Sequence, residues 1–151
     1  MKTFRVSLAL ILVAIGFASS GCVSTSLTAN KTAGADLSGL KTFYVEKLPA
    51  DERNVHQVIA DQLTQMGYSA SAGTDSTPPA GTDAIVTYQD KWMWDFSMYM
   101  IELNIQFRDP KTRFTLVNGK SFRTSLARKS PQGMAAEVLA EIFKQQPPSS
   151  P

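Results

Sequence analysis

The spacing of hydrophobic residues predicts two amphipathic helices. In residues 54–66 apolar side chains recur at three- and four-residue intervals, the period of one helix face. Asp51 or Asn54 is suited to cap the start of this helix. Near the end of the chain, Ser130 is a good N-cap and Pro131 fits the first helical position, so a second helix is expected to begin there.

Strand patterns fill much of the remaining sequence. Residues 98–107 alternate between apolar and polar, as expected of an antiparallel strand with one buried face. Four other segments also favour strands: 40–48, 68–71, 84–94 and 113–125. The last is either a single strand bulged at Asn118-Gly119 or a hairpin that turns there, and we favour the bulged strand.

The order β-α-β-β-β-β-α predicts the fold class. Runs of consecutive strands are typical of antiparallel sheets, and two amphipathic helices can cover one side of such a sheet. We therefore expect an α+β domain with a mainly antiparallel sheet of four to five strands and both helices packed on one face.

The first 21 residues have the pattern of an export signal. Lys2 and Arg5 precede a 13-residue apolar stretch, Val6–Ala18. This stretch is too short to cross a bilayer as a helix, but it has the length of a signal-peptide core. Small residues then lead to Cys22, the one cysteine of the chain. A plain secreted protein with an incidental cysteine is the alternative interpretation.

The segment Ser20-Gly21-Cys22 resembles the lipobox of bacterial lipoproteins, with Ser19 standing where that family usually has leucine. The resemblance implies cleavage between Gly21 and Cys22 and acylation of Cys22 with palmitate-like chains. Two or more acyl chains anchor a protein stably, whereas one chain binds only marginally. Val23 replaces the aspartate that retains such lipoproteins in the inner membrane, so the resemblance implies the periplasmic side of the outer membrane.

These patterns divide the chain into four parts. Residues 1–21 are expected to be the signal peptide, and residues 22–36, rich in Ser, Thr, Ala and Gly, a lipidated flexible tether. A single domain is expected over 37–145, which is long enough for one hydrophobic core. Residues 146–151 form a Pro/Ser tail that cannot continue a helix.

Charge and composition argue against several kinds of function. The chain has a formal net charge of +2, but Lys2 and Arg5 account for that excess, and the remaining charges balance. A neutral mature protein lacks the basic footprint of nucleic-acid binding. With one cysteine and one histidine, an internal disulfide is excluded and a Cys/His zinc site is not expected. We expect neither a metal nor a cofactor.

No catalytic constellation stands out in the sequence. His56 lies off the apolar face of its helix and is expected to be solvated. No GxSxG motif surrounds a serine, and no phosphate-binding glycine loop is present. We therefore predict that the protein is not an enzyme and has no catalytic residues. The scattered aspartates and glutamates leave a carboxylate-based hydrolase as a weaker alternative.

Two segments are candidates for binding. Residues 92–100 contain both tryptophans, and they either pack beneath a helix or present a hydrophobic rim to a partner or an acyl chain. Basic residues dominate 108–129, which is either a solvated sheet face or a patch for anionic lipid, lipopolysaccharide phosphate or an acidic protein. The candidate binding patch consists of Trp92, Trp94, Phe96, Arg108, Arg113, Arg123, Arg128 and Lys129.

The C-terminal half resembles a family of small Gram-negative outer-membrane lipoproteins with a domain of unknown function. The resemblance lies mainly in Trp92-Met93-Trp94-Asp95, Asp109-Pro110-Lys111-Thr112, Gly119-Lys120-Ser121-Phe122-Arg123 and the helix of residues 134–143. The order of elements is also similar to that of the lipopolysaccharide-assembly lipoprotein and of lipoprotein activators of cell-wall synthases. Similarity of fold alone transfers no function.

Together these observations predict a non-enzymatic lipoprotein of the bacterial envelope. Its expected contacts are the membrane, through lipidated Cys22, and an envelope protein partner that it binds as an assembly or accessory subunit. The alternative is a lipoprotein that binds lipid or lipopolysaccharide. No nucleic-acid partner is expected.

Overall fold

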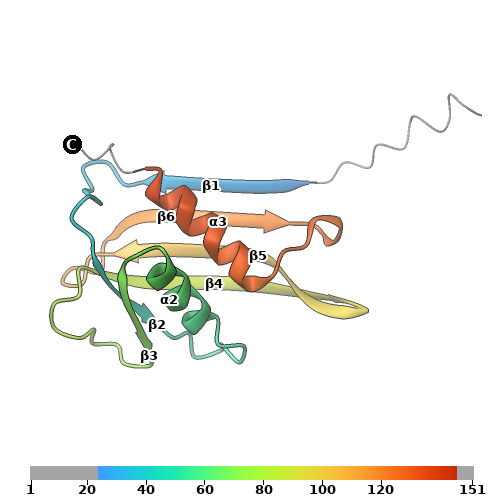
Figure 1. Cartoon of the computed structure of the whole chain (residues 1–151), viewed down its shortest axis with the longest axis horizontal. Coiled ribbons are helices and arrows are strands. Elements are labelled where there is room, and N and C mark those ends of the chain that lie inside the picture. Colours follow the sequence, from blue (N-terminus) through green and yellow to red (C-terminus); the bar gives the residue numbers. More distant parts are fainter. Residues whose placement is uncertain (1–23, 146–151) are drawn as a thin grey trace, which may run out of the picture.

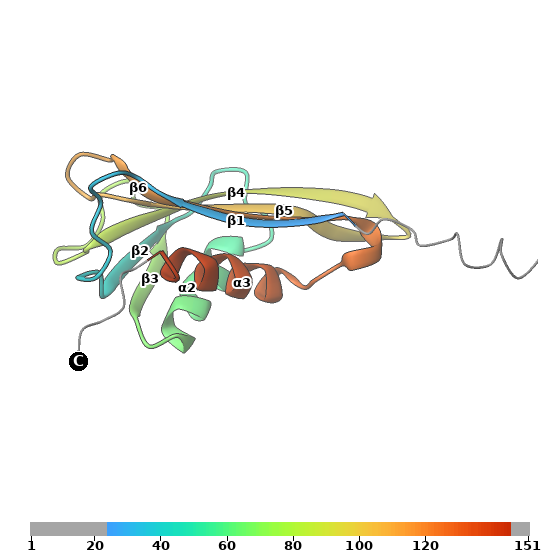
Figure 2. The same ribbon diagram turned by 90° about the horizontal axis from the view of Figure 1, so that it is seen from above.

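The computed structural model describes residues 24–145 as a six-stranded sheet with two helices on one face (Figures 1 and 2). The strands are β1 (Thr25–Lys31), β2 (Thr42–Glu46), β3 (Ser69–Gly73), β4 (Ala84–Asp95), β5 (Ser97–Arg108) and β6 (Thr115–Arg123). The helices are α2 (Val55–Gln65), α3 (Pro131–Phe143) and the short 3-10 helix η1 (Ser125–Ala127). The α+β class and both amphipathic helices are thus confirmed. The predicted signal peptide, its cleavage site at Gly21, the lipidated Cys22 and the Pro/Ser tail lie outside the described residues.

The strand order across the sheet is β1-β6-β5-β4-β2-β3. The pairs β1–β6, β6–β5 and β5–β4 are antiparallel, whereas β2 runs parallel to both β4 and β3. The parallel pair β2 and β3 follows from the helix between them, because a strand-helix-strand crossover returns the chain in the same direction. The predicted sheet of four to five mainly antiparallel strands was therefore one strand short and missed both parallel pairs.

The additional strand, β1, lies within the segment predicted to be a flexible tether. It pairs antiparallel with β6 along its whole length, from Thr25 opposite Arg123 to Lys31 opposite Val117. Six of its seven residues are exposed and one is half-buried, so no hydrophobic alternation marks it in the sequence. Backbone hydrogen bonds to the otherwise free edge of β6 hold it in place. As a correction to the predicted boundaries, the folded domain starts at Thr25.

Strand register also differs from the pattern read in the sequence. β6 is continuous and in register with both neighbours at Asn118 and Gly119, so neither the predicted bulge nor the hairpin is present there. One register shift lies instead between Phe107 and Arg108 of β5, where Leu116 is the extra residue of β6, and another lies between Lys91 and Trp92 of β4. The extra residue on β5 at the second shift is Ile101, and beyond it the alternation of buried and exposed residues changes phase.

The two helices begin in different ways. The Ser130 hydroxyl accepts a hydrogen bond from the Gly133 amide at 3.1 Å, which confirms Ser130 as the N-cap of α3. Asn54 is the N-cap residue of α2 and has a left-handed backbone (φ 57°), but its side chain makes no capping hydrogen bond. The Asp51 carboxylate instead accepts the His56 amide of the first turn at 3.2 Å.

The hydrophobic core lies between the sheet and the two helices. An aromatic cluster links strands and helices, with ring centroids between 4.5 and 6.1 Å apart. Its members are Phe43, Tyr68, Phe107 and Phe143. The helices contribute the buried residues Val55, Ile59, Leu63, Met134, Val138, Leu139 and Ile142. Each such side chain stabilises the fold by roughly 1.5–3 kcal/mol on full burial.

Helix α3 crosses β6 at Gly119. A Cβ atom added to Gly119 would lie 2.6 Å from Cγ1 of Ile142 and 3.0 Å from Cγ1 of Val138. The absence of a side chain at this position therefore sets how closely α3 approaches the sheet.

We expect Gly119→Ala to lower the free energy of unfolding by about 1–3 kcal/mol, because the new methyl group overpacks the contact between β6 and α3. Thermal and urea denaturation of the purified protein measure this change. Gly39→Ala is the matched control, since a Cβ added there meets no atom within 4 Å. Equal melting temperatures for the two variants would contradict the prediction.

Candidate functional site

The face of the sheet that the helices leave uncovered is polar and rich in side-chain amides. Directly opposed residues of antiparallel strands lie on the same face, so two rows of side chains cross β4, β5, β6 and β1. One row is Gln89, Asn104, Lys120 and Thr28, and the adjacent row is Thr87, Gln106, Asn118 and Asn30. We call these eight residues the amide face.

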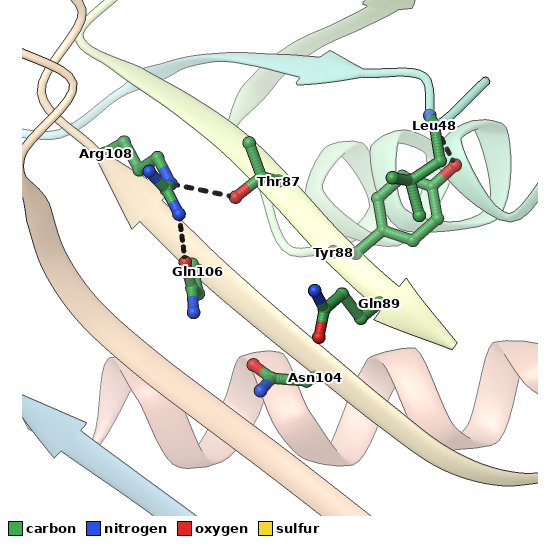
Figure 3. Close-up of a pocket in the computed structure, with 7 residues that line it drawn as sticks. All are labelled: Leu48, Thr87, Tyr88, Gln89, Asn104, Gln106 and Arg108. Carbon is green, nitrogen blue, oxygen red and sulfur yellow. Dashed lines mark hydrogen bonds between the residues drawn. The ribbon is translucent and has the colours of Figure 1, made fainter. Parts of the chain in front are cut away.

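A pocket of about 190 Å³ lies where the amide face meets the free edge of β4. β2 pairs with β4 only as far as Val86, so the later part of β4 has no strand on that side. The pocket is lined by Leu48, Thr87, Tyr88, Gln89, Asn104, Gln106 and Arg108 (Figure 3). It therefore combines four polar side chains of the two central strands with one cation.

Arg108 is held across the strands rather than extended into solvent. Its Nε donates to Oγ1 of Thr87 at 3.1 Å, and its Nη2 donates to Oε1 of Gln106 at 2.6 Å (Figure 3). These bonds fix the guanidinium against the sheet. Both partners are neutral, so neither offsets the positive charge of the guanidinium, which can attract an incoming acceptor or anion.

Two amide oxygens on this face have no hydrogen-bond partner within residues 24–145. They are Oδ1 of Asn104 and Oδ1 of Asn118, both buried at the level of the atom. An unpaired buried carbonyl costs roughly 1–3 kcal/mol. A ligand's hydroxyl or amide N–H donor would satisfy either oxygen once rotation of the asparagine side chain exposed it. The polar residues that alternate with apolar ones along each strand are the sequence signal for this site. The same alternation is also typical of an ordinary solvated sheet face, so it does not by itself indicate a site.

The structure does not bring the eight residues of the predicted binding patch together. Arg108 lines the pocket, whereas Arg113 forms an ion pair with Glu46, a residue of β2. Arg123 and Lys129 both bind Glu137, a residue of α3. The remaining four residues, Trp92, Trp94, Phe96 and Arg128, belong to the β4–β5 hairpin and the segment that follows η1.

Glu137 holds two of the predicted basic residues inside the domain. Its carboxylate accepts hydrogen bonds from Arg123, from Lys129 and from the Ser121 hydroxyl, the last at 2.5 Å. Burial opposes ionisation of Glu137, but these three donors outweigh it and lower the pKa of the carboxyl to about 2. Arg123 and Lys129 therefore share one carboxylate within the domain, which offsets one of their two positive charges.

The two tryptophans lie in different environments. Trp92 is half-buried against the core, with the Arg53 guanidinium 4.8 Å from its ring centroid and its indole N–H donated to Asp90. Trp94 is 69% exposed, and Phe96 is fully exposed. Of the two alternatives for this segment, packing against the core describes Trp92, and an exposed hydrophobic rim describes Trp94 and Phe96.

His56 is not the solvated residue that the sequence predicted. Its Nδ1 lies 2.9 Å from Oδ2 of Asp51, which also accepts the Tyr88 hydroxyl at 2.7 Å, and its side chain is only 13% exposed. Burial opposes ionisation of Asp51, but hydrogen bonds from Tyr88 and His56 hold the pKa of this carboxyl far below its usual range. Burial together with the Asp51 contact raises the pKa of Tyr88.

This cluster resembles part of a catalytic triad, but its visible role is to cap α2. A nucleophile would have to bond the second nitrogen of the imidazole. No serine, threonine or cysteine does so within residues 24–145. In the same part of the chain, no group of three or more His, Cys, Asp or Glu residues is placed to hold a metal ion.

Comparisons with known proteins identify the fold. No family model matches the chain, and no curated protein matches it in sequence. PelC from Paraburkholderia phytofirmans, solved as a dodecamer, is similar with a TM-score of 0.56 and 14% identity over 78% of this chain and 98% of PelC. A variant PelC dodecamer gives a TM-score of 0.58 with 11% identity, over 78% of this chain and 97% of the other. These likenesses show a shared fold.

Other solved structures are similar over different extents. A PDZ domain protein from Parabacteroides distasonis has a TM-score of 0.50 and 13% identity, over 91% of this chain and 40% of its own. Lower-scoring matches include TolB and a minor lipoprotein, both from Acinetobacter baumannii, with TM-scores of 0.45 and 0.37. Scores this low carry no functional argument. Among residues 24–145, no helix is both long and apolar enough to cross a membrane.

Glu137→Gln is expected to lower the free energy of unfolding by about 2 kcal/mol at pH 7, because Arg123 and Lys129 lose their shared partner. The folded-state pKa lies below the unfolded value of 4.5, so the wild-type advantage is present above pH 4.5 and is lost as the pH falls toward 2. Denaturation across this range measures it. Glu141→Gln, which removes only the exposed pair with Lys144, is the control. A difference between wild type and Glu137→Gln that stays constant with pH would contradict the assignment.

The two tryptophans should respond differently to a soluble quencher. In Trp92→Phe the remaining Trp94 is expected to emit at long wavelength and to be strongly quenched by acrylamide, because most of its ring is in water. In Trp94→Phe the remaining Trp92 should be partly protected. Equal quenching of the two single-tryptophan proteins would show that the hairpin does not have this geometry.

Proposed function

We propose that this chain is a non-enzymatic lipoprotein of the bacterial envelope that binds another envelope component through its amide face. Acylated Cys22 holds it to the periplasmic side of the outer membrane. In this proposal the domain acts as an assembly or accessory subunit. It positions its partner by hydrogen bonds and carries out no chemistry.

The uncovered amide face is the observation that supports this proposal most directly. It spans four strands and contains the amides of Asn104 and Asn118, whose buried oxygens have no hydrogen-bond partner among residues 24–145, and Asn104 lines the pocket together with the charged Arg108. Such a surface is suited to an extended ligand with many donors, such as a polypeptide segment. Acceptors and donors placed on rigid strands give specificity at low conformational cost.

Self-association is a second way in which a domain of this fold can bind a partner. The PelC chains that share the fold were solved as dodecamers. A partner bound at the amide face is therefore either a different envelope protein or a second copy of this chain. The mass of the purified complex separates the two.

Binding of lipid or lipopolysaccharide through the predicted basic patch has less support. Arg113, Arg123, Arg128 and Lys129 each have an acidic partner within the chain. An anionic headgroup would have to displace those carboxylates. A ligand that binds the neutral donors and acceptors of the amide face would not have to displace a carboxylate.

The proposal predicts one partner recovered in a fixed ratio when the native lipoprotein is purified by affinity from detergent-solubilised membranes. Gln89→Arg should reduce recovery about tenfold, because a long cation then occupies the β4 side of the amide face, at the pocket. Gln57→Arg makes the same change at an exposed position of α2 and should have no effect. Mass spectrometry of the mature N-terminus, with Cys22→Ser as the unanchored control, tests lipidation separately.

Three outcomes count against the proposal. Recovery of the protein alone would remove the assembly role. Full recovery of the partner with Gln89→Arg would show that another surface binds it. Bound lipid in place of a protein partner would favour the alternative ligand class.

A further inference from the structure

The β4–β5 hairpin projects beyond the rest of the sheet (Figures 1 and 2). Its end carries exposed apolar side chains. Phe96 is fully exposed at the turn, where it adopts a left-handed backbone (φ 55°), and Leu126 of η1 is 80% exposed. The exposed apolar residues of this end are Met93, Trp94, Phe96, Met98 and Leu126, and we call them the apolar tip. Large exposed apolar residues gathered at one end of a domain indicate a contact surface.

Arg128 fixes the position of the apolar tip. Its guanidinium forms an ion pair with Asp95, donates to the Ser97 hydroxyl at 3.2 Å and lies 3.9 Å from the ring centroid of Tyr99. The same side chain donates to the Ser125 carbonyl at 3.0 Å, which ties η1 to the hairpin. Asp95 is the one charged residue of the segment 92–100, so its pairing leaves this part of the hairpin without a free charge.

The apolar tip and the start of the described chain lie at the same end of the sheet. Strand register places Ser26 level with Phe122, and Phe122 level with Glu102. From Glu102 the hairpin continues for five residues to Ser97, or about 15 Å beyond that level. Cys22 precedes Ser26 by four residues, and four residues of fully extended chain span at most about 14 Å. This reach matches the projection of the hairpin to within about 1 Å, so a chain that extends toward the hairpin end brings Cys22 close to the level of the apolar tip.

We infer that the apolar tip is a second membrane contact, which inserts into the interface of the bilayer that holds acylated Cys22. This inference rests on the lipid anchor of the proposed function. Tryptophan and phenylalanine favour the boundary between headgroups and acyl chains, and the paired Asp95 and Arg128 leave no isolated charge to desolvate. Two attachment points at one end of the sheet fix the strands roughly along the membrane normal, and the amide face then points sideways into the periplasm.

Fluorescence of Trp94 alone tests the contact. The full mature chain carrying Cys22→Ser and Trp92→Phe is mixed with vesicles of phosphatidylethanolamine containing some phosphatidylglycerol. Trp94 emission should shift to shorter wavelength, and lipids brominated on their acyl chains should quench it. The chain with Cys22→Ser and Trp94→Phe, which retains only Trp92, should show neither effect. Unshifted Trp94 emission at saturating lipid would overturn the inference.

Matched substitutions at the two ends of the sheet show whether the apolar tip provides the affinity. Phe96→Ser in the Cys22→Ser chain should weaken vesicle binding at least about tenfold in cosedimentation. Phe114→Ser is the control. Phe114 is likewise an exposed phenylalanine, with 69% of its surface accessible, but it lies in the β5–β6 turn at the opposite end of the sheet. Equal binding by the two variants would overturn the inference.

The experiment separates this inference from the proposed anchor. Unlipidated protein reports on the apolar tip alone, whereas the mass of Cys22 in the native protein reports on the anchor alone. A native protein without acyl chains but with a blue-shifted Trp94 would overturn the anchor and retain the contact. If Phe96→Ser changes the sedimentation coefficient of the free protein and leaves vesicle binding intact, the apolar tip joins copies of the chain and the membrane inference is wrong.

Discussion

The packing of α2 and α3 against a single face of the sheet is the constraint on which the rest of the structure depends. It buries the inward-facing side chains of the central strands, and the aromatic cluster around Phe43 joins α3 to them. Gly119 allows α3 to lie close to β6, so Val138 and Ile142 of α3 pack directly on the backbone of the sheet. Because only one face is covered, the opposite side chains of the same strands must be compatible with water. The amide face is the direct product of that asymmetry.

Differences in strand length produce the other surface features. β4 and β5 have twelve residues each, whereas β2 has five, so the central hairpin continues beyond its neighbours at one end. The uncovered part of β4 borders the pocket, and the far end of the hairpin carries the apolar tip. Both features arise from the same mismatch in length. The two surfaces are well separated in role: one is polar and faces sideways, and the other is apolar and terminal.

Ion pairs inside the domain determine which charges remain available to a partner. Glu137 engages Arg123 and Lys129, and Asp95 engages Arg128. Those three cations lie in a strongly basic stretch of sequence, and each has an acidic partner in the folded domain, although Arg123 and Lys129 share one carboxylate. Arg108, which contacts only neutral side chains, remains the cation beside the amide face. A linear count of charge therefore overstates the basic character of this surface.

The sequence by itself determined the α+β class, both helices, the Ser130 cap and the central strands, because each depends on a local period or a local hydrogen bond. For residues 92–100 it allowed two interpretations, an exposed hydrophobic rim or a segment packed against the core. Trp92 and Trp94 lie two residues apart, and only the folded sheet shows that Trp92 is packed and Trp94 is exposed. Tertiary structure alone decided the strand β1, whose exposed side chains carry no pattern and whose backbone pairs with a distant edge. It also decided the parallel pairing of β2, the Asp51–His56–Tyr88 cluster and the Glu137 ion pairs. The strand pairings and the Tyr88–Asp51 contact join residues far apart in the chain, and the Arg123–Glu137 pair joins β6 to α3, so no local spacing encodes them.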